Sequence, residues 1–283
     1  MKAELLVSAE TLAARLGDPD WIVFDTRHDL AWPDKGREAW RAAHVPGAYF
    51  MHLDQDLSGP KTGKNGRHPL PPIPDFAARM NRCGVAPGRQ VVVYDDGGGS
   101  FAVRLWWMLR WLGHDRVALL DGGFAAWKRE NRPLDAAVPA PREGRFEPRP
   151  AAGMTVDANG VAALLGDPAA KIVDARAATR FMGENETLDP VAGHIPGSHN
   201  RFWQHNLGYD GRFLTPEELR AEFLEELDGV SPERVVHSCG SGVTACHNLF
   251  AMELAGLAGS RLYPGSWSEW CADPARPVAT GPK

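Results

Sequence analysis

Val-Val-His-Ser-Cys-Gly-Ser-Gly-Val-Thr-Ala-Cys, residues 235–246, runs from a β-branched segment through a glycine-containing loop into a segment that can be helical. We expect a strand to end at about Ser238 and a helix to begin near Thr244. Strands that alternate with helices build mostly parallel sheets, and ligands bind outside the carboxyl ends of such strands. Cys239 is the first residue of the loop at that end. The stretch therefore predicts an α/β fold with a candidate reactive cysteine.

The loop offers backbone N–H groups rather than charged side chains. Gly240 and Gly242 can adopt backbone angles that other residues avoid, so several N–H groups can converge on one point. Because a helix N-terminus follows, these donors favour a thiolate or another anion. For an isolated cysteine beside a turn, a buried structural role would be the ordinary interpretation. The strand, Cys-Gly-x-Gly loop and helix together favour a reactive Cys239.

The chain contains an internal repeat, which predicts two tandem copies of this fold, each a mostly parallel sheet flanked by helices. The matching segments are WIVFDTR (21–27) with KIVDAR (171–176), HVPG (44–47) with HIPG (194–197), VVYDD (92–96) with VVHSC (235–239), and GGFAAW (122–127) with GSWSEW (265–270). A proline-rich stretch separates the copies, and proline at this density stiffens a connector. We expect a first domain over 1–142, a linker over 143–152 and a second domain over 153–283.

Two helices are predicted from local signals. Thr215-Pro216-Glu217-Glu218 has the pattern of a capping box with proline in the first turn. Residues 100–113, SFAVRLWWMLRWLG, are rich in tryptophan. This second stretch could be a stacking platform for a cofactor or bases, but a helix buried against the sheet is the favoured interpretation because aromatic side chains dominate cores.

Composition narrows the class of protein. The net charge is -5 with mixed signs, which argues against nucleic acid and anionic membranes as partners. No apolar run has the length of a membrane span, and the N-terminus lacks a signal-peptide pattern. The four cysteines, too few for a disulfide scaffold, suit a protein with free thiols. We therefore expect a cytoplasmic protein.

CGSGVTA at 239–245 resembles the active-site loop of the tandem-domain rhodanese family, and within it that of the 3-mercaptopyruvate sulfurtransferases. HVPGA, HIPGS, LLDGGFAAW and LYPGSWSEW extend the resemblance over nearly the whole chain. It implies a catalytic C-terminal domain, an inactive N-terminal copy and a persulfide on Cys239, without a cofactor or metal. The residue that matches Cys239 in the first copy is Asp96, and a carboxylate cannot carry sulfane sulfur.

The resemblance also implies roles for residues around Cys239. Ser241 would join a His and an Asp of the N-terminal half, here His68 and Asp54, in handling protons. Arg180 would hold the substrate carboxylate, beside the loop residues Gly240, Gly242, Val243 and Thr244. The position of a second substrate arginine in the family is occupied by Asp189, and Arg201 is a possible replacement. The two His-x-Pro-Gly turns and the Asp-x-Arg pairs 25/27 and 174/176 occur in both copies, which indicates a structural role.

These features predict transfer of sulfur from 3-mercaptopyruvate, through a Cys239 persulfide, to cyanide or to a thiol such as a small thiol or a thioredoxin-like protein. Thiosulfate as donor is the nearest alternative, but the neutral Gly240-Ser241 pair favours mercaptopyruvate. A non-enzymatic binding module is less consistent with Cys239, Ser241 and Arg180. A phosphatase would need an arginine where Ala245 stands. The spacing of Cys239 and Cys246 does not suit zinc, and Cys246 is expected to be a packed helix residue.

Overall fold

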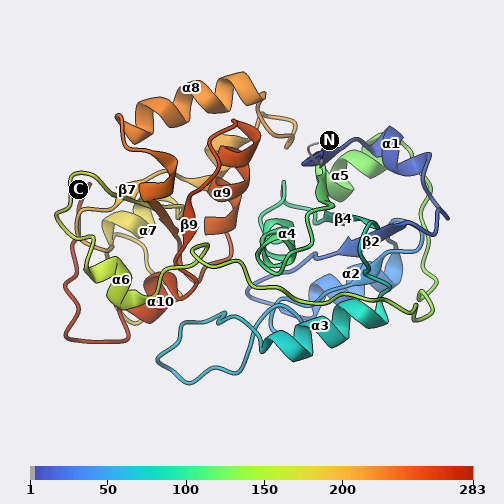
Figure 1. Cartoon of the computed structure of the whole chain (residues 1–283), viewed down its shortest axis with the longest axis horizontal. Coiled ribbons are helices and arrows are strands. Elements are labelled where there is room, and N and C mark those ends of the chain that lie inside the picture. Colours follow the sequence, from blue (N-terminus) through green and yellow to red (C-terminus); the bar gives the residue numbers. More distant parts are fainter. Residues whose placement is uncertain (1–3, 283) are drawn as a thin grey trace. The chain divides into compact units, whose positions relative to one another are not determined.

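The computed structural model describes residues 4–282 and divides into two compact units (Figure 1). The first unit comprises the chain up to Gly59, Leu70–Ala151 and Tyr209–Phe213. The second comprises Pro60–Pro69, Ala152–Gly208 and the chain from Leu214 onward. The main division lies between Ala151 and Ala152, but two short segments belong to the unit opposite to their half of the sequence. Within residues 4–282, no helix combines the length and the apolar character needed to cross a membrane.

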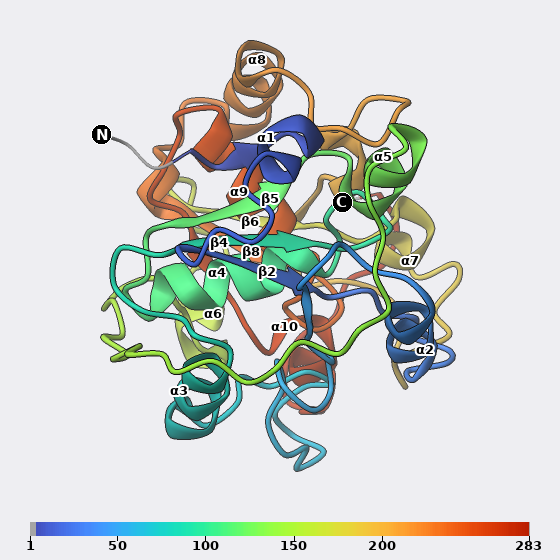
Figure 2. The same ribbon diagram turned by 90° about the vertical axis from the view of Figure 1, so that its right-hand side faces the viewer.

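The first unit is built on a five-stranded parallel sheet in the order β1-β5-β4-β2-β3. Its strands are β1 (Leu6–Val7), β2 (Trp21–Asp25), β3 (Tyr49–Phe50), β4 (Gln90–Tyr94) and β5 (Val117–Leu120). Its helices are α1 (Ala9–Ala13), α2 (Lys35–Ala42), α3 (Ile73–Arg82), α4 (Ala102–Trp111) and α5 (Gly123–Arg129). Figure 2 shows α1 and α5 on one side of the sheet and α4 on the other.

Helix α4 is the tryptophan-rich stretch, and the structure confirms that it is a buried helix. Trp106 and Trp107 are each about as inaccessible as any residue in the core. Burial of such large apolar side chains supplies much of the hydrophobic stabilisation of a domain of this size. The tryptophans therefore belong to the core and not to a ligand platform.

The second unit has a four-stranded parallel sheet in the order β7-β6-β8-β9. The strands are β6 (Lys171–Asp174), β7 (His199–Asn200), β8 (Val235–Ser238) and β9 (Arg261–Leu262). The helices are α6 (Ala158–Ala162), α7 (Ala178–Met182), α8 (Pro216–Leu227), α9 (Ala245–Leu254) and α10 (Ser266–Trp270), with 3-10 turns at Trp203–Asn206 and Pro232–Arg234. Val161 of α6 and Trp267 of α10 share one core cluster, and Phe223 of α8 and Met252 of α9 share another. The α/β fold class is thus confirmed in both units.

The two units repeat one another in the order of their strands. In the first unit β2 lies between β3, the short strand after the His-x-Pro-Gly turn, and β4, which leads to the glycine loop; in the second unit β6 lies in the same way between β7 and β8. His44 and His194 are fully buried, and Nδ1 of each ring bonds a main-chain carbonyl, at 2.7 and 2.8 Å. This shared geometry agrees with the structural role that the repeat indicated.

The capping box of α8 is present as its sequence predicted. The hydroxyl of Thr215 accepts the N–H of Glu218, while the carboxylate of Glu218 accepts the N–H of Thr215. Each side chain therefore satisfies a donor that the first turn of a helix leaves open.

Candidate active site

Cys239 lies at the carboxyl end of β8, at the start of the predicted glycine loop, and only 2% of its surface is exposed. Its Sγ accepts N–H groups from Gly242 at 3.2 Å and from Ser241 at 3.5 Å. Gly242 has φ +75°, and a Cβ there would lie 2.2 Å from the carbonyl oxygen of Pro264. Only glycine fits at position 242, and the backbone angles of this loop direct the N–H groups of Ser241 and Gly242 toward the same sulfur.

Helix α10 holds the loop through hydrogen bonds to the main chain of Cys239. The N–H of Cys239 donates to Oγ of Ser266 at 3.1 Å, and its carbonyl accepts the N–H of Trp267 at 3.0 Å. Ser266 has φ +52°, a region that residues with a Cβ seldom adopt. It aligns with Gly123 of the first copy, which has φ +57°. Sequence reasoning missed Ser266, although this alignment was a signal for it.

His68 and Ser241 meet in the second unit. Nδ1 of His68 lies 2.7 Å from Oγ of Ser241, and both side chains are buried, with 5% and 6% exposed. The two residues are 173 positions apart, and His68 reaches the loop because Pro60–Pro69 belongs to the second unit. Gly66 has φ +82°, and a Cβ there would lie 2.8 Å from the carbonyl oxygen of Gly265. This close approach fixes the segment that carries His68.

Asp54 belongs to the first unit, where its Oδ2 lies 3.9 Å from Nε2 of His28. His28, His52 and Asp54 offer ligand atoms within 4.8 Å of one another, the arrangement of a candidate metal site. However, the N–H of Asp54 donates to Nδ1 of His52 at 3.1 Å. Nε2 of that neutral ring then carries its proton and has no lone pair for a metal. These residues therefore do not fit a preformed metal site, and the catalytic role of Asp54 stays a prediction.

Arg180, on α7, faces Gly240, the residue after Cys239. Its Nη1 and Nη2 both lie 3.5 Å from the point that a Cβ on Gly240 would occupy. Nε and Nη2 bond the carboxylate of Glu186 at 2.8 to 3.1 Å, which leaves the Nη1 edge toward the loop. Although burial opposes ionisation, hydrogen bonds from the N–H of Leu188 and from Arg180 hold the pKa of Glu186 below its usual value. Nothing in the sequence indicates a role for Glu186.

A second guanidinium, which sequence reasoning missed, lies against Gly240. Nη2 of Arg67 is 2.8 Å from the point that a Cβ on Gly240 would occupy. Nη1 of Arg67 forms an ion pair with Asp189. The N–H of Arg67 donates to Oγ of Ser268 at 3.0 Å. The side chain of Asp189, which the sequence marked only as a departure from the family pattern, is therefore a partner of Arg67.

Arg201 does not share this environment. Its Nη2 bonds Oδ1 of Asn206 at 3.0 Å and Oε2 of Glu222 at 2.8 Å, and its guanidinium lies 4.2 Å from the ring centre of Phe223. These contacts direct Arg201 toward α8, while Arg67 and Arg180 face Gly240. Val243 and Thr244 complete the loop, and α9 begins directly after them.

The other cysteines have different surroundings. Cys246 is fully buried in α9, and its Sγ donates to the carbonyl of Gly242 at 3.5 Å. Burial raises the pKa of Cys83 and of Cys271 to about 11, so both are protonated thiols near neutral pH. Cys239 stands at the carboxyl end of β8, where two N–H groups of its own loop point at its sulfur.

The corresponding loop of the first unit is occupied by its own side chain. The carboxylate of Asp95 accepts N–H groups from Gly97, Gly99, Phe101 and Ala102 at 2.7 to 2.9 Å. These donors are therefore already satisfied by an internal anion. An aspartate stands where the second copy has its cysteine, and these four donors already bond an internal carboxylate, which agrees with the interpretation of a degenerate copy.

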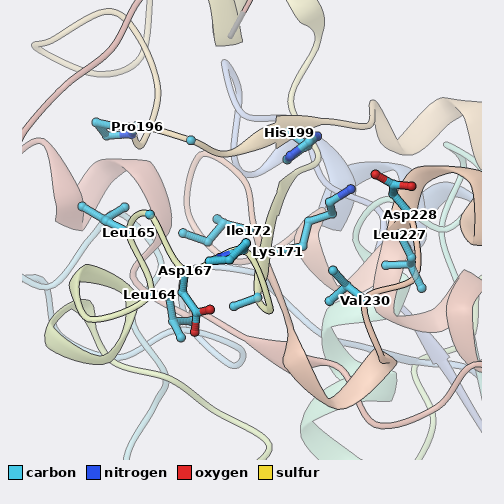
Figure 3. A pocket seen from close by; sticks show the side chains of 14 residues that line it. Leu164, Leu165, Asp167, Lys171, Ile172, Pro196, His199, Leu227, Asp228 and Val230 are labelled. Atoms are coloured by element: carbon cyan, nitrogen blue, oxygen red, sulfur yellow. The ribbon is translucent and has the colours of Figure 1, made fainter.

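A cavity of about 350 Å³ in the second unit lies away from this site (Figure 3). It is lined by Lys171, at the start of β6, with His199 and Asp228 nearby. Lys171 is paired with Val235 at the beginning of β8, whereas Cys239 follows the end of β8. The first unit has a matching cavity beside Trp21 and its Pro46-Gly47 turn. Because both units have it, we attribute this cavity to the fold.

The groups around Cys239 can carry out three chemical tasks together. The N–H pair stabilises negative charge on sulfur, and guanidinium groups bind a carboxylate or another anion next to it. A His bonded to a Ser hydroxyl can move a proton near neutral pH. This combination suits attack by a thiolate on an anionic sulfur compound.

Comparison with known proteins places this site in a family. The description Rhodanese-like domain matches residues 8–130 and 157–273. A probable 3-mercaptopyruvate sulfurtransferase of Pseudomonas aeruginosa is 50% identical over 283 residues, covering 99% of this chain and 100% of that protein. A putative thiosulfate sulfurtransferase, SseB, of Mycobacterium tuberculosis is 37% identical and covers 99% of this chain and 98% of its own length.

Solved structures agree. The 3-mercaptopyruvate sulfotransferase SseA of Escherichia coli superposes with a TM-score of 0.82 at 33% identity, covering 94% of this chain and 99% of that one. The loop around Cys239, the two copies of the fold and these relatives lead to one conclusion: the chain belongs to the rhodanese family of sulfurtransferases.

Proposed function

We propose that this chain takes sulfane sulfur from 3-mercaptopyruvate, holds it as a persulfide on Cys239 and passes it to a thiol or to cyanide. The observation that carries the proposal is the pairing of His68 with Ser241 at 2.7 Å beside the cradled sulfur. A persulfide needs only the cysteine and its N–H donors. A proton relay is needed only when the part of the donor that leaves carries the released electron pair on carbon, because that carbon must then be protonated.

The proposed reaction balances as follows. The Cys239 thiolate attacks the sulfur of the donor, an S–S bond forms, and the C–S bond breaks with its electron pair passing to carbon. The enolate of pyruvate results and takes up one proton. The donor thiol supplies a proton, and Ser241 with His68 can carry it to the methylene carbon. The persulfide then transfers its outer sulfur to the acceptor, and the Cys239 thiolate returns.

Thiosulfate is the alternative donor, supported by the similarity to a putative thiosulfate sulfurtransferase. Its cleavage releases sulfite, whose electron pair stays on sulfur and needs no proton at the moment of bond breaking. His68 and Ser241 would then have no chemical task. We therefore favour mercaptopyruvate, with Arg180 binding its carboxylate. Asp54, in the first unit, remains a predicted member of the proton relay.

The test compares Cys239→Ser with Cys246→Ser in the full chain. Cys239→Ser should abolish turnover of both donors and the mass gain of one sulfur atom that donor treatment produces. Cys246→Ser, the matched buried cysteine, should keep both. The kcat/KM values for mercaptopyruvate and thiosulfate, with cyanide as common acceptor, then decide the donor. A sulfur adduct that persists in Cys239→Ser would refute the mechanism, and faster use of thiosulfate would refute the donor.

A further inference from the structure

We propose that Arg67 is a donor-binding residue of this active site and that Asp189 sets the selectivity between donors by holding its guanidinium. The proposal rests on the proposed function, because it concerns the anion that delivers sulfur to Cys239. It adds a second cation to a loop whose own residues after the cysteine, Gly240 and Ser241, are neutral.

The position of the guanidinium is the first argument. Nη2 of Arg67 lies 2.8 Å, and both terminal nitrogens of Arg180 lie 3.5 Å, from the same point beside Gly240. Any side chain at 240 would occupy the space that the two guanidinium groups share. Glycine at this position therefore lets the two guanidinium groups lie directly against the loop next to Cys239. Two planar forks around one point suit a carboxylate or a sulfonate-like oxyanion.

The way in which Arg67 is held is the second argument. Only one of its terminal nitrogens, Nη1, engages the buried carboxylate of Asp189, while Nη2 faces Gly240. Its main chain is fixed by Ser268, and Gly66 closes against Gly265. About 26% of the side chain is exposed, so a small molecule can reach it. Arg67 is thus fixed in place and accessible, as a binding residue must be.

The charges around Arg67 and Arg180 bear on the selectivity between mercaptopyruvate and thiosulfate. The two guanidinium groups of Arg67 and Arg180 stand against two carboxylates, Glu186 and Asp189, which also lies 3.4 Å from Arg180. The formal charges of these four groups cancel. Such a cluster offers directed N–H donors to one carboxylate but little net attraction for a dianion. Asp189 therefore disfavours thiosulfate relative to mercaptopyruvate.

The experiment uses three single variants of the full chain, with both donors and cyanide as acceptor. Arg67→Gln should raise KM for mercaptopyruvate roughly ten- to hundredfold with little change in kcat, because a charge-assisted contact is lost in ground and transition states alike. Asp189→Asn keeps an oxygen for Arg67 but removes a charge. It should raise kcat/KM for thiosulfate severalfold relative to mercaptopyruvate. Arg234→Gln, which removes an arginine paired with Asp167 elsewhere in the second unit, should change neither value.

The outcomes separate this proposal from its alternatives. If Arg67 only ties the 60–69 segment to its surroundings, Arg67→Gln will lower kcat for both donors together with the melting temperature, and the proposal fails. It also fails if Asp189→Asn leaves the donor ratio unchanged. Failure of the proposed donor has a different signature, since the native chain would then use thiosulfate faster than mercaptopyruvate. The KM of Arg67→Gln for thiosulfate still tests anion binding in that case.

Discussion

Replacing Gly242 by alanine tests whether the N–H cradle sets the rate of persulfide formation. The new Cβ would sit at φ +75° and 2.2 Å from the carbonyl oxygen of Pro264. The left-handed angle alone costs about 1 to 2 kcal/mol. The contact is with main chain, which cannot swing aside like a side chain, so the loop must shift and the 3.2 Å bond to Sγ of Cys239 must lengthen.

The expected size follows from the lost bond. A hydrogen bond to a charged group contributes about 1.5 to 3 kcal/mol, which corresponds to a rate roughly ten- to hundredfold lower. The assay is single-turnover formation of the sulfur adduct, followed by intact mass, alongside thermal melting. Gly197→Ala is the matched control, because Gly197 has φ +74° in the same unit with no atom near its Cβ position. It should lose stability but form the adduct at the native rate.

A native rate of adduct formation in Gly242→Ala would refute this reasoning. It would mean that the loop keeps its donors on the sulfur despite the contact, or that the donors do not limit the reaction. Equal losses of rate in Gly242→Ala and Gly197→Ala would also refute it, since a general loss of stability would then explain both.

Two further predictions concern histidines. His68→Ala and Ser241→Ala should each lower kcat for mercaptopyruvate more than they change KM. The double variant should be little worse than either single variant, because the pair acts as a unit. Additive losses in the double variant would contradict a shared relay. Burial lowers the pKa of His237 from 6.5 to about 3, so the unfolded chain binds a proton that the folded chain excludes as pH falls from about 6.5 toward 3. In the native chain the free energy of unfolding should therefore fall with decreasing pH over that range, and His237→Leu should make this slope shallower by up to about 1.4 kcal/mol per pH unit. Denaturant unfolding at a series of pH values measures the slope. A slope that is the same in the native chain and the variant would show that His237 titrates normally.

Much of the fold is predictable from short stretches of sequence, because their signals are local. The capping box at Thr215 and the β-branched run before Cys239 depend only on neighbouring residues, and both elements form as predicted. The repeat of the His-x-Pro-Gly turns and Asp-x-Arg pairs shows that one fold occurs twice. The glycine loop also indicates that N–H groups stabilise negative charge there, since the freedom of Gly242 allows its N–H to point at Sγ of Cys239.

The surroundings of Cys239 depend instead on contacts between distant segments. His68 was assigned only by resemblance, and its bond to Ser241 spans 173 positions. Arg67 gave no signal, because nothing near it in the sequence indicates that residues 60–69 fold with the second unit. Ser266 carried a signal only through alignment with Gly123, since a serine is not expected at φ +52°.

Asp189 shows most clearly where local reasoning ends. In the sequence, Asp189 stands where the family has a second substrate arginine, and the residues after Cys239 are neutral. The structure pairs it with Arg67, 122 positions away, so a guanidinium reaches Gly240 from another segment. The sequence by itself determined the fold and its duplication and indicated Cys239 as the candidate reactive residue, because periodicity, turns and caps act over a few residues. The charge around that cysteine was decided only by the tertiary structure, because electrostatic interactions act through space between groups that the chain brings together.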